Sequence, residues 1–472
     1  MNAAPDARQL LDGQQAAFRA EAGADAGVRR ERLGRAIALL VDHQAGICEA
    51  LAHDFGRRSA TLTRFVDILP AITSLKHARS RVSRWMRPRR QRIGLPIWAP
   101  GVRAEIVPQP LGVIGLISPW NFPITLAFGP LAGILAAGNR CLIKPSELAP
   151  AVSALMAARV AEYFDPTEVA VVTGGADVAE KFSRLPFDHL IFTGSTSIGR
   201  RVMMAAAEHL VPVTLELGGK CPVLIGRSAA LGRTVDRILL GKLTNTGQMC
   251  IAPDYVLLPE AMLEPFVREA AAWMDRTYPG SVSNPDYTGL VSESHVERMR
   301  SLLADAAAKG ARVISLGTRT EAPRSRFVAP ALILDVTDDM RVMQEEIFGP
   351  LLPVRPYREI AAAVAQVNAR PKPLALYYFG EDRAEMQWVL AHTASGGATV
   401  NDVAVHFLAE EMPFGGVGAS GMGAYHGEHG FRRFSHERTV FRQTGLDVHG
   451  LAGLRPPYGR RAERVLKWLI RP

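Results

Sequence analysis

The first part of the chain carries apolar side chains at helical spacing. Between residues 28 and 57 they recur every three or four positions, at Leu33, Ile37, Leu40, Val41, Cys48, Leu51 and Phe55. Such spacing predicts amphipathic helix with one face against a core, and we expect more helix to about residue 85. Pro88, Pro96 and Pro100 then predict an extended crossing segment.

Short apolar runs alternate with helical patterns from residue 111 to residue 217. We expect strands at 111–118, 140–144, 168–173, 189–193 and 212–217. The expected helices between them are 124–137, 150–164, 177–183 and 196–208. Strands that are apolar throughout predict a parallel sheet covered on both faces.

A second α/β unit is expected from about residue 219 to residue 418. Its predicted helices are 261–274, 295–310 and 360–367, and its predicted strand is 332–336. The glycine-rich run at 414–423 predicts a hinge or loop.

Polar residues gather where the first five predicted strands end. They are Asn121, then Lys144, Ser146 and Glu147, then Gly174 and Gly175, then Gly194 and Ser195, and finally Glu216. Parallel sheets bind ligands beyond the carboxyl ends of their strands. The coincidence therefore predicts a cofactor site at this edge.

The run Gly194–Gly199 lacks the G-x-G-x-x-G dinucleotide fingerprint, because four residues separate its glycines. Backbone amides at the start of the following helix, with the Ser195 hydroxyl, could receive a phosphate. An ordinary glycine turn with a serine N-cap fits the same run equally well.

Three residues far apart in the sequence suggest covalent chemistry on a carbonyl group. Cys250 is a lone thiol in the run GQMCIAP, Glu216 lies in LELGGK and Asn121 lies in PWNFP. A thiol can attack the carbonyl, an amide can hold the oxyanion and a carboxylate can activate water. The alternatives are a small buried thiol, a strand-ending carboxylate and a turn asparagine.

Composition limits the class of protein. The 472 residues carry 55 Lys and Arg against 46 Asp and Glu, so the net charge is +9. Two or three structural units are expected at this length. The positive charge is concentrated at 76–92, which is either an anion-facing or nucleic-acid patch or a solvated helix end. No nucleic-acid-binding motif accompanies it, so we expect no nucleic-acid partner.

The four cysteines, at 48, 141, 221 and 250, fit neither a zinc site nor a disulfide framework. They indicate reduced thiols in the cytoplasm, and no metal site is expected. The start of the chain lacks the layout of a signal peptide. The most apolar stretch, 124–138, is shorter than a membrane span and is broken by glycine and proline, so no integral membrane segment is expected.

Seven short motifs follow one another in a characteristic order. They are PWNFP at 119–123, KPSE at 144–147, FTGST at 192–196, LELGGK at 215–220, GQMC at 247–250, EEIFGP at 345–350 and PFGG at 413–416. Together they resemble the aldehyde dehydrogenase superfamily, and SGMGAYHG at 420–427 resembles its class 3 branch. Within that branch the chain is most similar to the coniferyl aldehyde dehydrogenases.

The resemblance implies an α/β fold with a Rossmann-type parallel sheet, a second α/β catalytic domain and a small oligomerisation arm. The implied domains are a dinucleotide-binding domain at 1–91 and 111–218, a catalytic domain at 219–420, bridging segments at 92–110 and 421–447, and a basic tail at 448–472. The family assembles through its arm, so we expect a homodimer.

The implied reaction is NAD(P)-dependent oxidation of an aldehyde to the carboxylic acid. The aldehyde is aromatic, such as coniferyl aldehyde, or medium-chain aliphatic. Cys250 is implied to be the nucleophile that forms a thiohemiacetal and then a thioester. The side-chain amide of Asn121 and the backbone N–H of Cys250 match the family's oxyanion hole, and Glu216 would activate water. Because a free glutamate is a weak base, we expect the site to raise the pKa of Glu216.

The resemblance also implies a set of cofactor-binding residues. They are Trp120, Lys144, Ser146, Glu147, Gly194, Ser195, Gly199, Leu217, Glu346 and Phe348. Glu147 could accept a hydrogen bond from a ribose 2′-hydroxyl and would repel a 2′-phosphate, which favours NAD. Class 3 relatives accept both cofactors, so NADP stays open. Trp120 fits a packed aromatic nearly as well.

Other interpretations remain open at this point. A CoA-acylating relative would pass the thioester to CoA and would not need Glu216. A cysteine hydrolase would need no nicotinamide. A non-catalytic nucleic-acid-binding or structural protein would exploit the charge of +9. The basic, amphipathic end of the chain, 458–472, is either loosely membrane-associated or packed on the protein's own surface.

Overall fold

The structure is a computed structural model that describes residues 6–21, 23–94, 101–317 and 326–471. Helical segments precede the central strands, and they are α1 (Ala7–Ala20), α2 (Ala26–Asp42), α3 (Gln44–Asp54), α4 (Ala60–Thr63), a π-helical turn (Arg64–Ile68) and α5 (Leu69–Trp85). The helical pattern predicted over 28–57 is divided between α2 and α3 because His43 leaves the helical region, with φ −109° and ψ 18°. Of the prolines expected to extend the crossing segment, Pro96 and Pro100 lie outside the described residues.

A six-stranded sheet forms the first layer, in the order β15-β7-β6-β3-β4-β5. Its strands are β3 (Val113–Ile117), β4 (Arg140–Lys144), β5 (Val169–Val171), β6 (His189–Gly194), β7 (Val213–Leu217) and β15 (Gly421–Met422). The five strands from β3 to β7 are parallel, as the sequence predicts. The run at 414–423 is not entirely loop, because β15 pairs antiparallel with β7.

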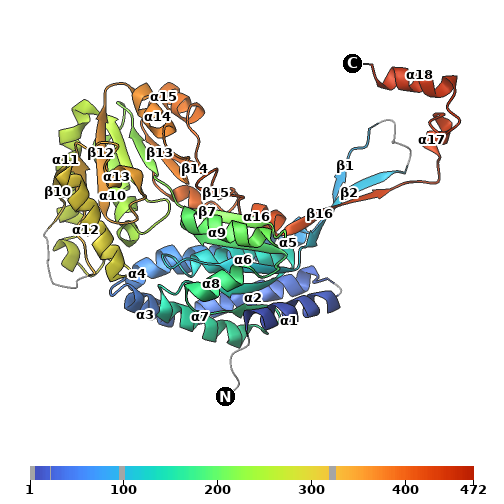
Figure 1. Cartoon of the computed structure of the whole chain (residues 1–472), viewed down its shortest axis with the longest axis horizontal. Coiled ribbons are helices and arrows are strands. Elements are labelled where there is room, and N and C mark those ends of the chain that lie inside the picture. Colours follow the sequence, from blue (N-terminus) through green and yellow to red (C-terminus); the bar gives the residue numbers. More distant parts are fainter. Residues whose placement is uncertain (1–5, 22, 95–100, 318–325, 472) are drawn as a thin grey trace.

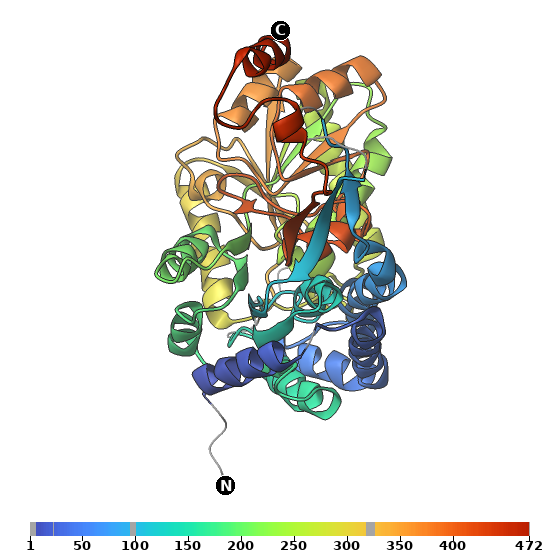
Figure 2. The same ribbon diagram turned by 90° about the vertical axis from the view of Figure 1, so that its right-hand side faces the viewer.

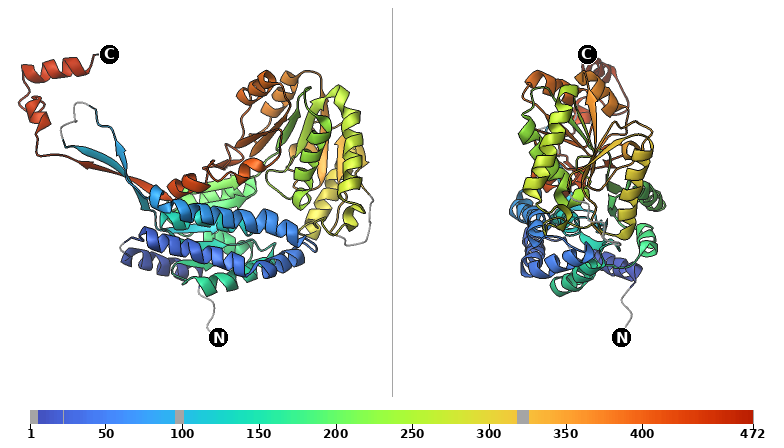
Figure 3. Two further views of the ribbon diagram at one scale, coloured as in Figure 1. Left: turned by 180° about the vertical axis from the view of Figure 1, so that it is seen from behind. Right: turned by 90° about the vertical axis from the view of Figure 1, so that its left-hand side faces the viewer.

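Helices cover both faces of this sheet (Figures 1 and 3). They are α6 (Thr125–Ala137), α7 (Pro150–Tyr163), α8 (Ala176–Ser183) and α9 (Thr196–Ala207), together with the N-terminal helices. Alternate side chains of β3 enter different cores. Ile114 and Leu116 pack in the core that contains α5 and α6, whereas Val113 packs with residues of α1, α8 and α9. This two-sided burial explains why the strands are apolar throughout.

A seven-stranded sheet forms the second lobe, in the order β10-β11-β12-β9-β8-β13-β14. Its strands are β8 (Pro222–Ile225), β9 (Tyr255–Pro259), β10 (Arg312–Ser315), β11 (Ala331–Leu334), β12 (Leu351–Tyr357), β13 (Ala375–Phe379) and β14 (Gly397–Val400). Its helices are α10 (Leu231–Leu243), α11 (Leu263–Thr277), α12 (Glu293–Ala308), α13 (Arg341–Gln344), α14 (Ile360–Asn368) and α15 (Arg383–Ala391). Only β10 among these strands runs antiparallel to its neighbour.

A three-stranded arm projects away from both lobes (Figure 1), and Figure 2 views the molecule from the side of this arm. It consists of β1 (Arg89–Gln91), β2 (Arg103–Pro110) and β16 (Ser435–Arg442), and β16 pairs with β2 along its whole length. The helix α16 (Gly427–Arg433) precedes the arm, and α17 (Val448–Leu451) and α18 (Arg460–Leu469) follow it. In the part of the chain that the structure describes, no helix is long and apolar enough to cross a membrane.

The strand order of the six-stranded sheet contains a topological switch point. The chain proceeds from β3 outward through β4 and β5, and then returns to the other side of β3 with β6 and β7. The carboxyl ends of β3 and β6 therefore flank a topological switch point, which is where open parallel sheets bind ligands. The second lobe lies across this edge (Figure 3).

Candidate active site

Asn121 lies in the loop between β3 and α6, and a buried ion pair holds that loop. Arg58 donates a hydrogen bond to the main-chain carbonyl of Asn121 at 3.0 Å and pairs with Asp67 at 3.1 Å. The Asp67 carboxylate also accepts from the amides of Ile124 and Thr125, at 3.0 and 2.8 Å. It therefore satisfies free N–H groups at the start of α6.

Cys250 follows a tight turn at the end of α10. Asn245 and Thr246 adopt left-handed conformations there, with φ of 50° and 57°. Gly247 also has positive φ, and a Cβ atom at this position would lie 2.2 Å from the main-chain oxygen of Gly349. Only glycine fits this close approach.

The side chain of Gln248 fixes the same turn from inside. Its amide nitrogen donates to the carbonyls of Asn245 and Gly289, at 2.9 and 3.1 Å, and its oxygen accepts from the amide of Val291 at 3.0 Å. All of these groups are buried, so each hydrogen bond would be costly to lose. The loop that carries Cys250 is therefore rigidly placed.

The two loops are joined to each other by hydrogen bonds. The side-chain amide of Asn121 donates to the main-chain carbonyl of Gln248 at 3.1 Å. The side-chain amide of Asn245 donates back to the carbonyl of Asn121 at 3.2 Å. The structure thus brings the predicted amide donor beside the turn that leads into Cys250, although 129 positions separate Asn121 from Cys250 in the sequence.

Cys250 is half-buried and carries no disulfide. Burial, followed by the charges of Glu346 and Glu216, raises the pKa of its thiol to about 12. The thiol is therefore protonated at neutral pH in the free protein. The charges of both carboxylates therefore act on the sulfur.

Glu216 lies in β7, and only 3% of the residue is exposed. Neither of its carboxylate oxygens has a hydrogen-bond partner among the described residues. Burial raises the pKa of this carboxyl well above its usual value, and the charge of Arg433 opposes that rise. A raised pKa at Glu216 agrees with the expectation for a general base, since an unpaired buried carboxylate gains basicity.

Glu346 packs directly against the backbone of the LELGGK segment. A Cβ atom at Gly218 would lie 2.0 Å from a Glu346 carboxylate oxygen. Burial, followed by the charge of Asp254, raises the pKa of Glu346 to about 8. Glu346 is thus close to Cys250 as well as to the strand that carries Glu216.

Trp120 and Phe348 meet in an aromatic cluster beside the Asn121 loop. Their ring centroids lie 5.4 Å apart at 74°, and the Trp120 ring also contacts His295 at 5.0 Å and Phe55 at 6.2 Å. Trp120 is half-buried and packs against these rings, which is compatible with both interpretations of the sequence, a packed aromatic and a residue that lines the cleft. It still forms one surface with Phe348, which the sequence assigned to the same cofactor site.

Lys144 is the last residue of β4, and Ser146 and Glu147 follow the strand. The ammonium of Lys144 donates to the carbonyl of Pro145 at 2.7 Å and lies 3.9 Å from the Glu147 carboxylate. Burial lowers the pKa of Lys144. Glu147 is exposed and Ser146 is half-buried, so the carboxylate is accessible to a ligand at this edge.

Ser195 caps α9, and its hydroxyl accepts from the amide of Ile198 at 3.4 Å. In the run Gly194–Gly199, Ser195 is therefore the N-cap of a helix, as one of the two interpretations of the sequence expected. Ser195 is exposed, and α9 begins beside the switch point, so an anion could still approach this helix end. Gly199 lies against Leu217, since a Cβ atom there would be 2.6 Å from a Leu217 methyl group.

Several residues that organise the site were missed by sequence reasoning. They are Arg58, Asp67, Asn245, Gln248, Tyr425 and Arg433. A buried charge or amide has no sequence signature of its own, because its burial and its partner depend on the fold, whether the partner is near, as for Arg58 and Asp67, or far along the chain. The GQMC and SGMGAYHG motifs contain Gln248 and Tyr425, but the contacts of these side chains follow only from the fold. Among the described residues no group of His, Cys, Asp or Glu is arranged to hold a metal ion.

The arrangement combines a thiol, an amide donor and an unpaired buried carboxylate in one place. These groups can capture a carbonyl carbon, stabilise the resulting oxyanion and deprotonate a water molecule. The exposed carboxylate of Glu147 and the start of α9 lie at the neighbouring strand ends. An extended cofactor could therefore reach from there to the thiol.

Comparison with known proteins supports this interpretation. A model of the aldehyde dehydrogenase family matches residues 2–440. The chain is 50% identical over 466 residues to a probable coniferyl aldehyde dehydrogenase of Caulobacter vibrioides, covering 98% of this chain and 96% of the relative. It is 48% identical over 477 residues to a coniferyl aldehyde dehydrogenase of a Pseudomonas species, covering 100% of this chain and 98% of the relative.

Solved structures show the same similarity. The substrate-bound AldH of Staphylococcus aureus superposes with a TM-score of 0.92 at 35% identity, covering 99% of this chain and 100% of that one.

Proposed function

The chain belongs to the aldehyde dehydrogenase family, and from this premise we propose that Cys250, Asn121 and Glu216 oxidise an aldehyde to its carboxylic acid. We assign these roles because the three residues, which are far apart in the sequence, come together in the folded chain. Asn121 is hydrogen-bonded to the turn before Cys250 at 3.1 Å, and the Glu216 carboxylate acts electrostatically on the same sulfur. The family uses NAD or NADP as the oxidant.

The thiol of Cys250 loses its proton and adds to the aldehyde carbon. The new oxyanion is stabilised by the side-chain amide of Asn121 and the backbone N–H of Cys250. An oxyanion donor of this kind lowers the barrier by about 3 kcal/mol. The nicotinamide, when bound, supplies the acceptor for the hydride that leaves this adduct. Cys250 then holds the substrate as a thioester.

Glu216 activates the water molecule that hydrolyses the thioester. Its unpaired, buried carboxylate supports this role, because its raised pKa makes it a stronger base than a solvated glutamate. A CoA-acylating enzyme would have no use for such a group. Hydrolysis is therefore favoured over transfer to CoA.

The cofactor-binding residues fit a dinucleotide at the switch point. The exposed Ser195 at the start of α9 and the Lys144–Glu147 pair lie at the ends of β6 and β4, the two strands that flank β3. We propose that Glu147 and Lys144 contact the adenosine ribose and that Glu346, Phe348 and Trp120 line the nicotinamide end. The accessible carboxylate of Glu147 favours NAD over NADP, because it would repel a 2′-phosphate.

The substrate is proposed to be an aromatic aldehyde such as coniferyl aldehyde. The relatives at 50% and 48% identity are named for that activity. Medium-chain aliphatic aldehydes are the competing class. The Trp120–Phe348 cluster supplies an aromatic wall that suits a planar ring.

We also propose a cytoplasmic homodimer. The four cysteines are free in the structure, which suits a reducing compartment. Away from both lobes, β16 of the arm exposes Phe441 and the following helix α18 exposes Trp468, apolar side chains that a second copy could cover. We propose that the dinucleotide-binding domain is built on the six-stranded sheet, the catalytic domain on the seven-stranded sheet and the bridging segments on the arm, with β1 and β15 crossing the bounds expected from the sequence.

One experiment tests the whole assignment. The purified protein is supplied with NAD or NADP and a panel of aromatic and aliphatic aldehydes, and NADH or NADPH formation is followed. We expect turnover with NAD and an aromatic aldehyde, and none from Cys250→Ala. Full turnover by Cys250→Ala, or hydrolytic activity that needs no nicotinamide, would contradict the proposal.

A further inference from the structure

The loop that carries Glu346 and Phe348 contains a residue in an unfavourable backbone conformation. The loop spans residues 345–350 between α13 and β12, and Phe348 within it has a φ of 51°. A bulky residue with a Cβ atom is strained in this left-handed region. Such a conformation persists only where the surrounding structure holds it, and the contacts of the two preceding residues show what does so.

Arg298, on α12, holds the loop by two main-chain carbonyls. Its guanidinium donates to the carbonyl of Ile347 at 2.6 Å and to the carbonyl of Glu346. It also lies 3.4 Å from the Glu345 carboxylate. The carbonyl of Ile347 belongs to the peptide group that enters Phe348. Because the planar guanidinium fixes that peptide group, it restricts the φ angle of Phe348.

Other groups hold the start of the same loop. The amide of Ile347 donates to the Asp254 carboxylate at 2.9 Å, and the ammonium of Lys220 donates to the carbonyl of Glu345 at 2.9 Å. These contacts fix the loop against the LELGGK segment. Arg298 acts from the opposite side, on the carbonyls nearest to the strained residue.

The same face of α12 also supports Trp120. His295 lies three positions before Arg298, so the two side chains are neighbours on the helix. The His295 ring contacts the Trp120 ring at 5.0 Å, and its Nδ1 lies 2.7 Å from the hydroxyl of Ser292, which caps α12. The start of α12 thus supports both aromatic residues of the proposed nicotinamide end, Trp120 through His295 and Phe348 through Arg298.

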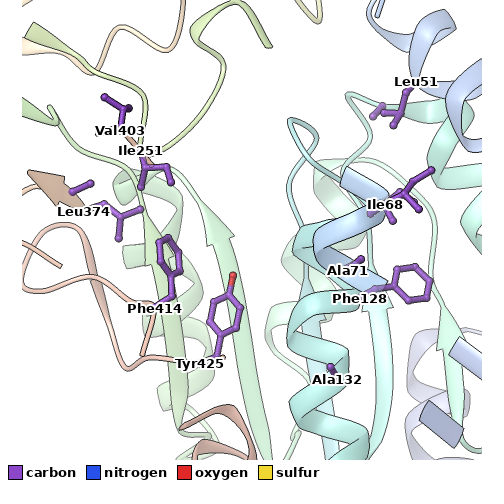
Figure 4. Packing of buried hydrophobic residues seen from close by; sticks show 14 of the residues in the cluster. Leu51, Ile68, Ala71, Phe128, Ala132, Ile251, Leu374, Val403, Phe414 and Tyr425 are labelled. Atoms are coloured by element: carbon purple, nitrogen blue, oxygen red, sulfur yellow. The ribbon is translucent and has the colours of Figure 1, made fainter. Parts of the chain in front are cut away.

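The turn that carries Cys250 is held independently of Arg298. Ile251, the next residue, is buried in the core with Leu374 and Val403, as Figure 4 shows. Loss of Arg298 should therefore disturb the nicotinamide end of the site without moving the thiol.

We propose that Arg298 is a positioning residue for the nicotinamide cofactor, because it keeps the loop of Glu346 and Phe348 in the left-handed geometry that binds the cofactor. The inference rests on the proposed function, since it needs these two residues at the nicotinamide end. Without Arg298 only a fraction of the molecules would have the competent loop, and the apparent Kd for NAD would rise by the inverse of that fraction. Saturating NAD would restore the loop, so kcat should change little.

Direct binding of NAD, measured by isothermal titration calorimetry, tests the inference without turnover. Arg298→Gln should raise the Kd for NAD by about tenfold, the loss expected for one charge-assisted hydrogen bond. Steady-state rates should show a similar rise in KM for NAD, with kcat and KM for the aldehyde little changed. Arg298→Lys should raise the Kd by about threefold, because lysine keeps the charge but not the planar fork. It provides the same test if the glutamine variant does not fold.

Arg341→Gln is the matched control. The side chains of Arg341 and Arg298 are 38% and 30% exposed, and both bind the Glu345 carboxylate. Arg341 also donates to the Ser301 hydroxyl at 2.7 Å. Within the described part of the chain, its side chain donates to no carbonyl of the loop 345–350. Arg341→Gln should therefore keep the wild-type affinity for NAD.

Substitutions of Phe348 separate positioning from direct contact with the cofactor. Phe348→Ala and Phe348→Gly both remove the ring, but only glycine adopts a positive φ without strain. Arg298→Gln should weaken NAD binding by a further factor of about ten in the alanine background and of less than about three in the glycine background. If Arg298 instead touched NAD directly, the added loss would be the same in both.

A wild-type Kd for NAD in both Arg298 variants would overturn the inference. An equal loss in Arg341→Gln, or equal added losses in the two Phe348 backgrounds, would overturn it as well. Iodoacetamide labelling of Cys250 at pH 7 should be unchanged in Arg298→Gln, and an altered rate would show that the defect reaches the thiol and would count against the inference. A wild-type protein that binds neither NAD nor NADP would instead refute the proposed function itself.

Discussion

Cys250 should react slowly with alkylating agents in the enzyme without cofactor. Burial, followed by the charges of Glu346 and Glu216, raises the pKa of its thiol from 9.0 to about 12. A rise of about three in pKa corresponds to about 4 kcal/mol. It lowers the thiolate fraction at pH 8 by about a thousandfold, and only the thiolate is alkylated.

Replacement of one neighbouring carboxylate shows how much of this effect is electrostatic. The pKa of Glu346 is raised to about 8, so its charge acts on the thiol mainly at higher pH. Glu346→Gln should therefore accelerate alkylation of Cys250 by about tenfold at pH near 9.5, the effect of losing one nearby charge. It should change the rate little at pH 7, where the carboxyl is largely protonated.

The assay is the rate of iodoacetamide labelling at Cys250, followed by mass spectrometry across the pH range. Glu345→Gln is the matched control, because that carboxylate pairs with Arg341 at 2.9 Å and with Arg298 at 3.4 Å. It should leave the profile unchanged. A labelling midpoint near pH 9 in the wild type, or equal profiles for Glu346→Gln and Glu345→Gln, would refute the reasoning.

Further predictions concern single side chains of the site. Glu216→Gln should give one burst of NADH per site and then lower the steady-state rate by about 10²–10⁴-fold, and continued turnover at the wild-type rate would contradict its role as base. Asn121→Ala should lower kcat by about 10²–10³-fold in steady-state assays, and a change confined to KM would contradict an oxyanion role. Glu147→Gln should raise kcat/KM with NADP relative to NAD, and an unchanged ratio would remove Glu147 from the ribose site. Asp67→Asn should cost about 3–5 kcal/mol in denaturant unfolding, because it leaves the buried Arg58 unpaired, and a loss below about 1 kcal/mol would contradict that pairing.

Much of the fold could be predicted from the chain because its signals are local. The strand at Arg140–Lys144 has the predicted bounds, and α6 and α7 differ from prediction by one residue at an end. Apolar runs and helical periodicity are read within a few residues, so tertiary packing did not need to be known. The division of the 28–57 pattern at His43 was not predictable, because neither proline nor glycine marks it.

The pairing of β15 with β7 shows where local patterns fail. A two-residue strand in a glycine-rich run has no periodicity, and its hydrogen bonds come from a partner about 200 positions earlier. The same holds for Arg58 and Asp67, whose charges are stable inside only because the fold places them 3.1 Å apart. Nothing near either residue in the sequence announces that contact.

The sequence by itself determined which chemical groups are present and in which motifs, and hence the family and the parts of its reaction. Only the tertiary structure decided how those groups act. Burial raises the pKa values of Cys250, Glu216 and Glu346, neighbouring carboxylates add to the rise at Cys250 and Glu346, and the joined loops aim the amide of Asn121 at the turn before the thiol. Composition is a property of the chain, whereas solvation and electrostatic field depend on which distant segments the fold brings together.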